Sequence, residues 1–325
     1  MKPIRLAIVG ATGLVGRTTL TILEEWNVPL RSLRLFASEG SAGQVLPFAG
    51  REVPVEQLDG APRGIDAAIF ATSRTISRRW IPEFRTAGIP VIDHSSEFRM
   101  ADDVPLLIPE VNAHTLKRHR NLISNPNCSA SIIVIPLAAL VRIMEMKTVI
   151  VDTYQSVSGS GQDALTELNR ELEDPLYTPA VYPRVIAHNL FPQIGEFDEH
   201  GVCYEEQKVA EELCKMLELP GLHTLVTTVR VPVRIGHSAA VTIECASEVD
   251  LPRVEAAFAE MPGMIFERND YRTPLEIAGR QEVFVGRLRR SPRNPRWIQF
   301  WVVGDNSRKG AASNAIQILM ELFKE

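Results

Sequence analysis

One cysteine of this chain, Cys128, lies where a polar turn meets an apolar run, in the segment LISNPNCSASIIV. Asn125, Pro126 and Asn127 form a turn signal, and a helix-like segment begins at Ser129. A thiol in the first turn of a helix faces backbone N–H groups without helical partners and the positive end of the helix dipole, and both favour the thiolate. The position suits a nucleophile, but alone it leaves a buried apolar thiol, a disulfide partner and a metal ligand open.

The other cysteines narrow these alternatives. Cys203, Cys214 and Cys245 are widely spaced, with no Cys-x-x-Cys pair and no nearby His-x-x-x-His. In a chain of 325 residues this spacing argues against a zinc site and against a disulfide framework. We expect these three thiols to be packing or surface residues, and we expect no bound metal.

The composition is that of a globular protein, with 45% hydrophobic and 23% charged residues, and the length suggests about two domains. A net charge of −5 argues against nucleic acid as a partner, because phosphate binding requires a basic face. The longest apolar run, near 132–141, is too short to span a bilayer, and the N-terminus shows no separate signal sequence. We therefore expect a cytoplasmic protein without a membrane partner.

The elements that must position Cys128 fall into two groups. Before residue 125, short apolar strands alternate with helical stretches, which is typical of parallel βαβ units. After the helix that follows Cys128, segments alternate in polarity and lie close to turn signals, which predicts a mostly antiparallel sheet with helices between its strands. The C-terminal segment 309–325 reads as an amphipathic helix that returns to the first group. The strands expected in the first group are 4–9, 33–38, 66–72, 89–94 and 121–125.

The sequence therefore predicts an α/β protein with a Rossmann-type dinucleotide-binding domain and a second, α+β domain. Residues 1–127 with 306–325 are expected to form the first domain, and residues 128–305 the second. Three glycines, Gly10, Gly13 and Gly16, follow the first strand directly and open a helix. Such a loop lets the backbone approach a pyrophosphate and directs a helix N-terminus at its charge. This context predicts a bound dinucleotide and disfavours a ligand-free glycine connection.

Eight segments in chain order resemble the aspartate-β-semialdehyde dehydrogenase family: GATGLVG, FRMADDVPLLIPEVNAH, SNPNCSAS, TYQSVSGSGQDAL, AHNLFPQIGEF, YEEQKVAEE, RVPVRIGHS and DNSRKGAASNA. The resemblance covers essentially the whole chain, and its specificity comes from the combination of blocks. It implies NADPH-dependent reduction of L-4-aspartyl phosphate to L-aspartate 4-semialdehyde and phosphate, in lysine, threonine, methionine and diaminopimelate biosynthesis. It also implies a homodimer whose interface lies in the second domain, which is then the catalytic and dimerisation domain.

The same resemblance implies roles for individual residues. Cys128 is the nucleophile that forms a thioacyl intermediate, and His237 is the acid/base. Arg99 and Lys208 contact the departing phosphate, whose growing charge two cations stabilise. Arg230 binds the carboxylate of the substrate, and Glu205 binds its amino group. The side-chain amides of Gln155 and Asn127 orient the acyl group. The cofactor contacts are Gly10, Thr12, Gly13, Leu14, Val15, Gly16, Ser38, Gly40, Ser41, Ser158, Gly159 and Asn306.

The residues alone also allow plainer interpretations. His237 follows Gly236 in a turn expected between strands that end near Arg234 and begin near Ser238, where a histidine would be exposed and silent. Arg230 would be an exposed strand arginine. Glu205 and Lys208, three residues apart on an expected helix, would form a solvated ion pair.

The choice of nucleotide depends on the segment FASEGSAG. In many family members an arginine and a serine here bind the 2′-phosphate of NADP, whereas this chain has Gly40 in place of the arginine and keeps Ser41. Glu39 suits the free 2′-hydroxyl of NAD, while Arg74 could reach the adenosine phosphate or pyrophosphate. We expect NADP with reduced discrimination against NAD. A further departure from the family pattern is His94, where a smaller polar residue is usual.

Two other assignments compete with this one. N-acetyl-γ-glutamyl-phosphate reductase shares the fold and the chemistry, but its cysteine block usually reads Gly-Cys followed by an aromatic residue, where this chain has Asn127 and Ser129. A non-catalytic paralogue would lose the cysteine and the cations, which this chain keeps. Both are therefore ranked below the dehydrogenase.

Overall fold

The computed structural model describes residues 1–174 and 176–324, which form two compact units. The first unit is Met1–Pro126 with Ala311–Glu325, and the second is Asn127–Gly310. The division expected from the sequence lies one residue later at the first boundary and five residues earlier at the second. As limits of independently folding domains, the expected boundaries stay a prediction.

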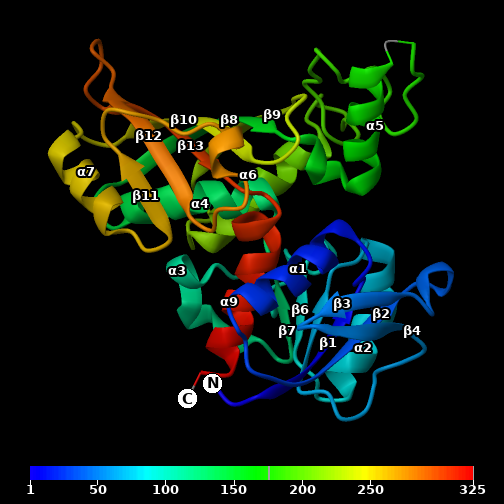
Figure 1. Ribbon diagram of the computed structural model, residues 1–325. Helices are drawn as coiled ribbons and strands as arrows, with labels where there is room; N and C mark the ends of the chain where they lie inside the picture. The colour runs from blue at the N-terminus through cyan, green and yellow to red at the C-terminus, as the bar shows by residue number, and fades with distance from the viewer. Residues whose placement is uncertain (175, 325) are drawn as a thin grey trace. The chain divides into compact units, whose positions relative to one another are not determined.

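The first unit contains a seven-stranded sheet in the order β3-β4-β2-β1-β5-β6-β7 (Figure 1). Its neighbouring strands pair in parallel, except for the antiparallel pair β3–β4. The strands are β1 (Ile4–Val9), β2 (Leu30–Ala37), β3 (Val45–Phe48), β4 (Arg51–Gln57), β5 (Ala67–Phe70), β6 (Val91–Asp93) and β7 (Leu122–Ser124). The helices are α1 (Leu14–Glu25), α2 (Arg74–Thr86), α3 (Pro109–Asn112) and α9 (Ser313–Leu322).

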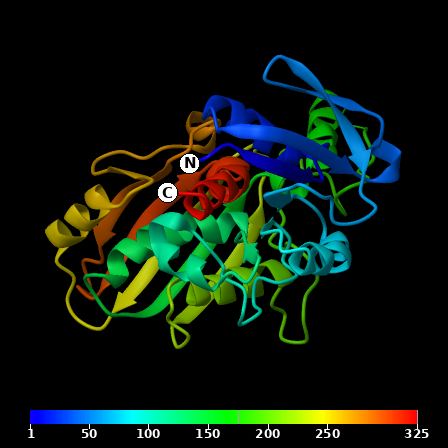
Figure 2. The same cartoon turned by 90° about the horizontal axis from the view of Figure 1, so that it is seen from below.

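Both faces of this sheet are covered, as parallel strands require. On one face Leu6 and Ile8 of β1 share a core with α1 and α9, which contact each other (Figures 1 and 2). On the other face Val9 packs in a second core with Phe84 of α2, whose ring meets Phe70 edge-on at 4.9 Å. The C-terminal helix α9 thus packs within the first unit, as its amphipathic pattern predicts.

Two strands of this sheet, β3 and β4, were not predicted from the sequence. Each contains a proline, Pro47 and Pro54, and proline lacks the N–H that a ladder needs. Here β3 is the edge strand, and β4 pairs with β2 only from Val55 onward. Both prolines therefore lie at positions a sheet tolerates.

The second unit contains a six-stranded sheet in the order β11-β12-β13-β10-β8-β9. Three neighbouring pairs are antiparallel, while β8–β9 and β11–β12 are parallel, so the sheet is mixed and mostly antiparallel, as the sequence predicts. A parallel pair needs a long crossover connection, and α5 and α6 provide it between β8 and β9. The strands are β8 (Met146–Gln155), β9 (His223–Arg230), β10 (His237–Cys245), β11 (Met264–Glu267), β12 (Val283–Arg290) and β13 (Trp297–Gly304).

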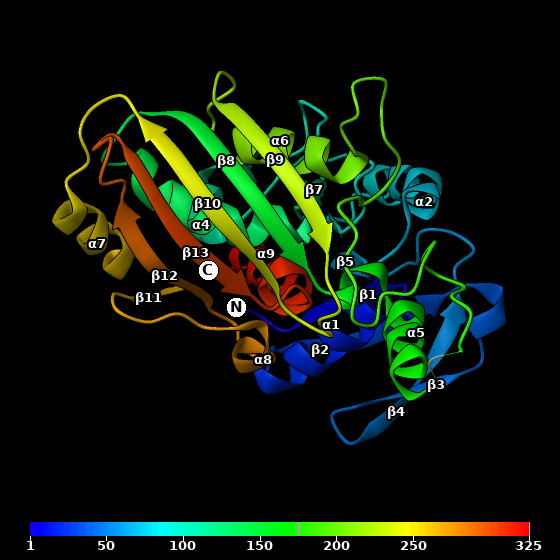
Figure 3. The ribbon, with the colours of Figure 1, turned by 90° about the horizontal axis from the view of Figure 1, so that it is seen from above.

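One face of this sheet is covered by helices. The most buried is α4 (Cys128–Val141), which contacts β8, β10, β12 and β13 as well as α6 and α7. Figure 3 looks onto the opposite face, with α4 and α6 behind the strands. The remaining helices are α5 (Gln162–Glu173), α6 (Tyr204–Met216), α7 (Leu251–Glu260) and α8 (Pro274–Ile277). Within the described part of the chain, none of the helices has both the length and the apolar sequence that crossing a membrane requires.

Candidate active site

Cys128 is the first residue of α4 and is half-buried. The side-chain oxygen of Asn127 caps this helix, accepting from the backbone N–H groups of Ser129 at 2.9 Å and Ala130 at 3.2 Å. The expected placement of the thiol at a helix start is confirmed. Gly310 lies against it, since an added Cβ there would be 3.0 Å from the Cys128 Cβ. A larger residue at 310 would crowd the thiol.

Two buried carboxylates of α6 hold the turn before the cysteine. Glu205 Oε1 accepts from Asn127 Nδ2 at 2.8 Å, and Glu212 Oε2 accepts from the Asn127 backbone N–H at 2.6 Å. They are seven residues apart, two helical turns, and so share the face that packs inward. Glu212 was not predicted, although its spacing from Glu205 was a signal that could have found it.

Glu205 is the centre of a charged cluster. Its Oε2 lies 2.6 Å from Lys208 Nζ, and its Oε1 also accepts from Gln155 Nε2 at 3.4 Å. Burial alone would raise the pKa of Glu205, but the charges of Lys208 and Arg230 and the hydrogen bonds to the carboxylate lower it below its usual value. The carboxylate of this ion pair is therefore ionised and buried, while Lys208 is partly exposed, so the fully solvated ion pair considered from spacing alone is wrong.

Arg230 ends β9 beside Gln155, its register partner on β8. Its side chain is buried, at 4% exposure, and Nη1 donates to the Ser156 carbonyl oxygen at 2.6 Å. The interpretation of Arg230 as an exposed arginine on a strand is therefore also wrong. A buried, oriented guanidinium is suited to binding a carboxylate.

His237 is the first residue of β10 and is 2% exposed. The strand before it, β9, ends at Arg230, earlier than expected, and β8 lies between β9 and β10 in the sheet. Because the ring is buried, the interpretation of His237 as an exposed and silent histidine is wrong. Burial, and then the charge of Arg230, lower the pKa of His237 to about 3. Its Nδ1 accepts from the Ser156 backbone N–H at 3.0 Å, and its Nε2 has no hydrogen-bond partner among the described residues.

Gly159 packs directly against the side chains of Arg230 and His237. A Cβ built there would lie 2.8 Å from Arg230 Nη1 and 3.1 Å from His237 Nε2. Ser158 and Asn306, expected to contact the cofactor, bond to each other at 2.9 Å. Asn306 Oδ1 also accepts from the Gly236 backbone N–H at 2.9 Å, so this pair supports the loop before His237.

In the first unit, the glycine loop has the geometry that a dinucleotide needs. An added Cβ on Gly10 would lie 2.2 Å from the Ala71 carbonyl oxygen, and one on Gly16 would lie 2.3 Å from the Gly10 carbonyl oxygen. Gly13 is the N-cap of α1 and no side chain caps that helix. The backbone N–H groups in the first turn of α1 are therefore suited to binding a pyrophosphate.

Comparisons with known proteins agree with this geometry. Residues 5–119 match the family Semialdehyde dehydrogenase, NAD binding domain, and residues 137–309 match Semialdehyde dehydrogenase, dimerisation domain. Aspartate-semialdehyde dehydrogenase of Aquifex aeolicus is 40% identical over 334 residues, covering 99% of this chain and 98% of that protein. The protein of the same name from Rickettsia bellii is also 40% identical, with the same coverage.

A crystal structure of aspartate semialdehyde dehydrogenase II from Vibrio cholerae complexed with ASA superposes with a TM-score of 0.97 at 35% identity, covering 100% of this chain and 99% of that one. The chain belongs to the aspartate-semialdehyde dehydrogenase family. The resemblance carried by the eight segments is confirmed, and so is the two-domain α/β fold with a dinucleotide-binding and a dimerisation domain. As a member of this family the chain is an oxidoreductase.

Two residues that the family comparison singled out, Arg99 and His94, lie together in the first unit. Arg99 is buried and donates from Nε to the Asn125 carbonyl oxygen at 3.0 Å and from Nη2 to the His94 carbonyl oxygen at 2.6 Å. Burial, and then the charge of Arg99, lower the pKa of His94 to about 3. His94 therefore supplies a backbone acceptor that orients Arg99, and a neutral ring. Phosphate binding by Arg99 stays a prediction.

Of the residues expected at the adenosine end of the family's cofactor site, Ser38 and Gly40 are exposed and Ser41 is half-buried. Glu39, Gly40 and Ser41 form a short 3-10 helix after β2, and an added Cβ on Gly40 meets no atom within 4 Å. Arg74 begins α2, and its Nε lies 3.2 Å from Glu97 Oε2. The ion pair leaves Arg74 half-exposed, so its expected contact with the nucleotide stays a prediction.

The other thiols have surroundings unlike that of Cys128. Cys203 is buried with Sγ 3.2 Å from Thr228 Oγ1, and Cys214 Sγ donates to the Leu222 carbonyl oxygen at 3.5 Å. Burial, and then the charge of Glu244, raise the pKa of Cys245 to about 11, so that thiol stays protonated. All four cysteines are free. Among the described residues, no group of three or more His, Cys, Asp or Glu side chains could hold a metal ion.

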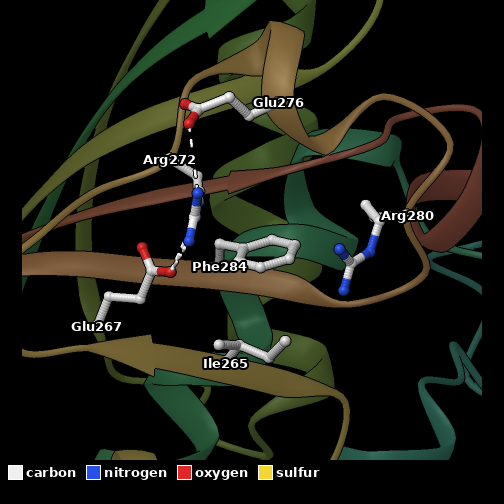
Figure 4. A pocket seen from close by; sticks show the side chains of 6 residues that line it. All are labelled: Ile265, Glu267, Arg272, Glu276, Arg280 and Phe284. Atoms are coloured by element: carbon white, nitrogen blue, oxygen red, sulfur yellow. Dashed lines mark hydrogen bonds and ion pairs between the residues drawn. The ribbon is translucent and has the colours of Figure 1, made fainter.

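Two cavities of the second unit differ in their relation to the candidate residues. One of about 930 Å³ is lined by residues 180–184 and 189–197 and by Arg230. The other, of about 260 Å³, is lined by residues of β11, β12 and the segment around α8, and is drawn in Figure 4. There Arg272 pairs with Glu267 at 2.7 Å and with Glu276 at 3.3 Å around Phe284. Of these two cavities, the first is lined by Arg230, which the resemblance assigns to substrate binding.

Proposed function

We propose that this chain catalyses the NADPH-dependent reductive dephosphorylation of L-4-aspartyl phosphate to L-aspartate 4-semialdehyde, through a thioacyl intermediate on Cys128. The observation that carries the proposal is the buried cluster of Asn127, Glu205, Arg230 and His237 in the same unit as a thiol at a helix start. Burying charged groups costs free energy, because each ion loses its hydration, so a buried charged cluster indicates a functional site. The reaction belongs to the biosynthesis of lysine, threonine, methionine and diaminopimelate.

Each charged group of the cluster matches one charge of the substrate. The Arg230 guanidinium binds the α-carboxylate, and the ionised Glu205 carboxylate binds the ammonium group. The amides of Asn127 and Gln155, both bonded to Glu205 Oε1, orient the acyl carbon toward the thiol. Lys208 stabilises the leaving phosphate, a role that the resemblance also gives to Arg99.

The nicotinamide dinucleotide supplies the hydride when it is bound. Its pyrophosphate would lie on the first turn of α1, with contacts from Gly10, Thr12, Gly13, Leu14, Val15 and Gly16. Ser38, Gly40 and Ser41 would surround the adenosine ribose, and Ser158, Gly159 and Asn306 would lie at the nicotinamide end. We propose NADP as the preferred form, with NAD also accepted.

A coupled assay tests the function. Purified protein, L-aspartate 4-semialdehyde, phosphate and NADP should give phosphate-dependent formation of NADPH. Replacing the semialdehyde with N-acetyl-L-glutamate 5-semialdehyde should give no turnover. Turnover on the acetylated substrate alone would identify the reductase instead, and turnover on neither would identify a non-catalytic paralogue.

The exposed position of Gly40 gives a test of nucleotide choice. The variant Gly40→Arg places a cation in open space after β2, so the ratio of kcat/KM for NADP over NAD should rise at least about tenfold, or about 1.4 kcal/mol. Gly40→Ala is the control without the charge. A wild-type ratio above about a thousand, or 4 kcal/mol, would show that other residues bind the 2′-phosphate, and a ratio below one would show that NAD is preferred.

Lys208 gives a test of the phosphate site. The variant Lys208→Ala should raise the KM for phosphate about tenfold and that for the semialdehyde much less, because the lysine faces the leaving group and not the amino acid. Lys215→Ala, on the same helix, is the control. Equal changes in both KM values would indicate that Lys208 acts only by holding Glu205 and Tyr204, its other contacts.

We also propose a homodimer formed across the helix-free face of the second sheet (Figure 3). The match to a dimerisation domain supports this, and the strands that form the face carry Leu225, half-exposed, and the neighbouring, tilted rings of Tyr154 and Trp301. Such apolar groups on an open sheet face are typical of an interface.

Sedimentation velocity should therefore give a dimer at micromolar concentration. Leu225→Glu should shift the protein toward the monomer, because it buries a charge in the interface. Leu275→Glu, at an exposed leucine of α8, should leave the dimer unchanged. A wild-type monomer would contradict the assembly.

A further inference from the structure

The loop of residues 180–187 in the second unit is fastened to α5 by two buried glutamates. Glu167, which is 2% exposed, accepts from three consecutive backbone N–H groups, those of residues 180–182, at 2.5, 2.6 and 2.9 Å. Glu171, one helical turn further along, accepts from the N–H groups of residues 186 and 187 at 2.9 and 2.8 Å. Because a carboxylate is buried at low cost only when hydrogen bonds replace its hydration, these bonds fix the loop against the helix.

The side chain that this arrangement places is Tyr182. Its hydroxyl donates to Ser160 Oγ at 2.9 Å, and its ring packs against that of Phe191 with 5.6 Å between the ring centroids. Burial raises the pKa of Tyr182 above its usual value, although the nearby charge of Arg230 opposes this shift. The phenol therefore keeps its proton at neutral pH and can act as a hydrogen-bond donor.

Both partners of Tyr182 belong to segments that contact Arg230. Phe191 exchanges two backbone hydrogen bonds with Arg230, at 3.0 and 2.8 Å. Ser160 follows Gly159, where an added Cβ would lie 2.8 Å from Arg230 Nη1. Tyr182 and its two partners also line the cavity of about 930 Å³ that Arg230 lines. Tyr182 thus connects two of the chain segments that hold the arginine.

We propose that Tyr182 is a positioning residue for the reaction, and that its hydroxyl and ring hold Arg230 in the orientation that binds the carboxylate of the substrate. The inference rests on the proposed function, which assigns that carboxylate to Arg230. Nη1 already donates to the Ser156 carbonyl oxygen at 2.6 Å, so the orientation of the guanidinium depends on the backbone around it. A planar guanidinium binds a carboxylate through two parallel hydrogen bonds, and a small rotation weakens both.

Steady-state kinetics of Tyr182→Phe test the proposal. The variant keeps the ring and loses the hydroxyl, so the KM for L-aspartate 4-semialdehyde should rise about three- to tenfold, as expected for one lost hydrogen bond. The KM for phosphate and kcat should change by less than about twofold, because only substrate binding is affected. An unchanged KM for the semialdehyde, or equal rises in both KM values, would overturn the proposal.

Tyr177→Phe is the matched control. Tyr177 follows the same helix, but its ring lies 5.9 Å from the guanidinium of Arg170. Loss of its hydroxyl should leave both KM values unchanged. A selective rise in the KM for the semialdehyde in this variant would show that the effect is not particular to Tyr182, and would count against the proposal.

A double-variant cycle tests whether the effect passes through Ser160. Ser160→Ala removes the acceptor of the same hydrogen bond and should raise the KM for the semialdehyde by about the same factor. The double variant Tyr182→Phe with Ser160→Ala should bind the semialdehyde no more weakly than either single variant, because both changes remove one interaction. Effects that multiply would show that the phenol does not act through Ser160, and would overturn the proposed link.

A second cycle tests whether the effect reaches Arg230. Arg230→Lys keeps the charge but loses the planar guanidinium, and should raise the KM for the semialdehyde at least about tenfold. Adding Tyr182→Phe to it should cause little further rise, and a rise as large as in the wild type would contradict the positioning role. The wild-type assay separates the two claims. No turnover there would reject the proposed function and this inference with it, whereas turnover with an unaltered KM in Tyr182→Phe would reject only the positioning role.

Discussion

Replacing Cys128 with serine should lower kcat at least about a thousandfold, which corresponds to about 4 kcal/mol of lost transition-state stabilisation. A serine hydroxyl is a far weaker nucleophile than a thiol at neutral pH, because its pKa is far too high to supply an anion under the same conditions. Initial rates of phosphate-dependent NADPH formation measure the effect. Retention of more than about a tenth of the activity would rule out the covalent mechanism.

Two measurements separate this loss from damage to the fold. Titration with NADP should give an unchanged dissociation constant, because the glycine loop lies in the other unit. Cys214→Ser is the matched control, since Cys214 is also half-buried and its donor bond to the Leu222 carbonyl oxygen can be made by a hydroxyl. That variant should retain wild-type activity.

Adding a single methyl group at Gly159 should lower kcat/KM about a hundredfold, because a misplacement of about 1 Å in a reacting site costs this much. The new Cβ would be 2.8 Å from Arg230 Nη1, and the 2.6 Å bond to the Ser156 carbonyl oxygen prevents the guanidinium from moving away freely. The same Cβ would press on the Nε2 edge of His237. Steady-state kinetics in both directions measure the change, and a rise in KM for the semialdehyde should form part of it.

The backbone of Gly159 does not account for this expected loss, since its φ lies outside the left-handed region. Gly221→Ala is the control, because a Cβ there meets no atom within 4 Å. It should change kcat/KM by less than about twofold, as is usual for an open surface position. A Gly159→Ala variant as active as this control would show that Arg230 and His237 are not positioned as proposed.

Sequence patterns predicted the elements whose signal is local. The periodicity of apolar residues located α4, α6 and the strands β1, β2, β5, β6 and β7 of the first unit, and the turn before Cys128 located the start of its helix. The three-residue spacing of Glu205 and Lys208 predicted that their side chains meet. Their burial could not be read from spacing, because it depends on α4 packing against α6.

What the sequence did not reveal depends on pairing between distant segments. The crossover from β8 to β9 makes the pair parallel and aligns Gln155 with Arg230, residues far apart in the chain. His237 is buried because β10 pairs with both β8 and β13. Ser156 contributes through its backbone N–H, a group that every residue except proline has, so no side-chain pattern could identify it.

The amide of Asn127 has a consequence for the storage of this protein. Its oxygen caps α4, while its nitrogen donates to the buried Glu205 carboxylate. Slow hydrolysis of the amide would give aspartate, which still caps the helix but cannot donate and places a second negative charge beside Glu205. Stored material would thus lose activity while its helix content stays the same. The inactive fraction would carry one more negative charge and would separate from the active fraction on an anion-exchange column.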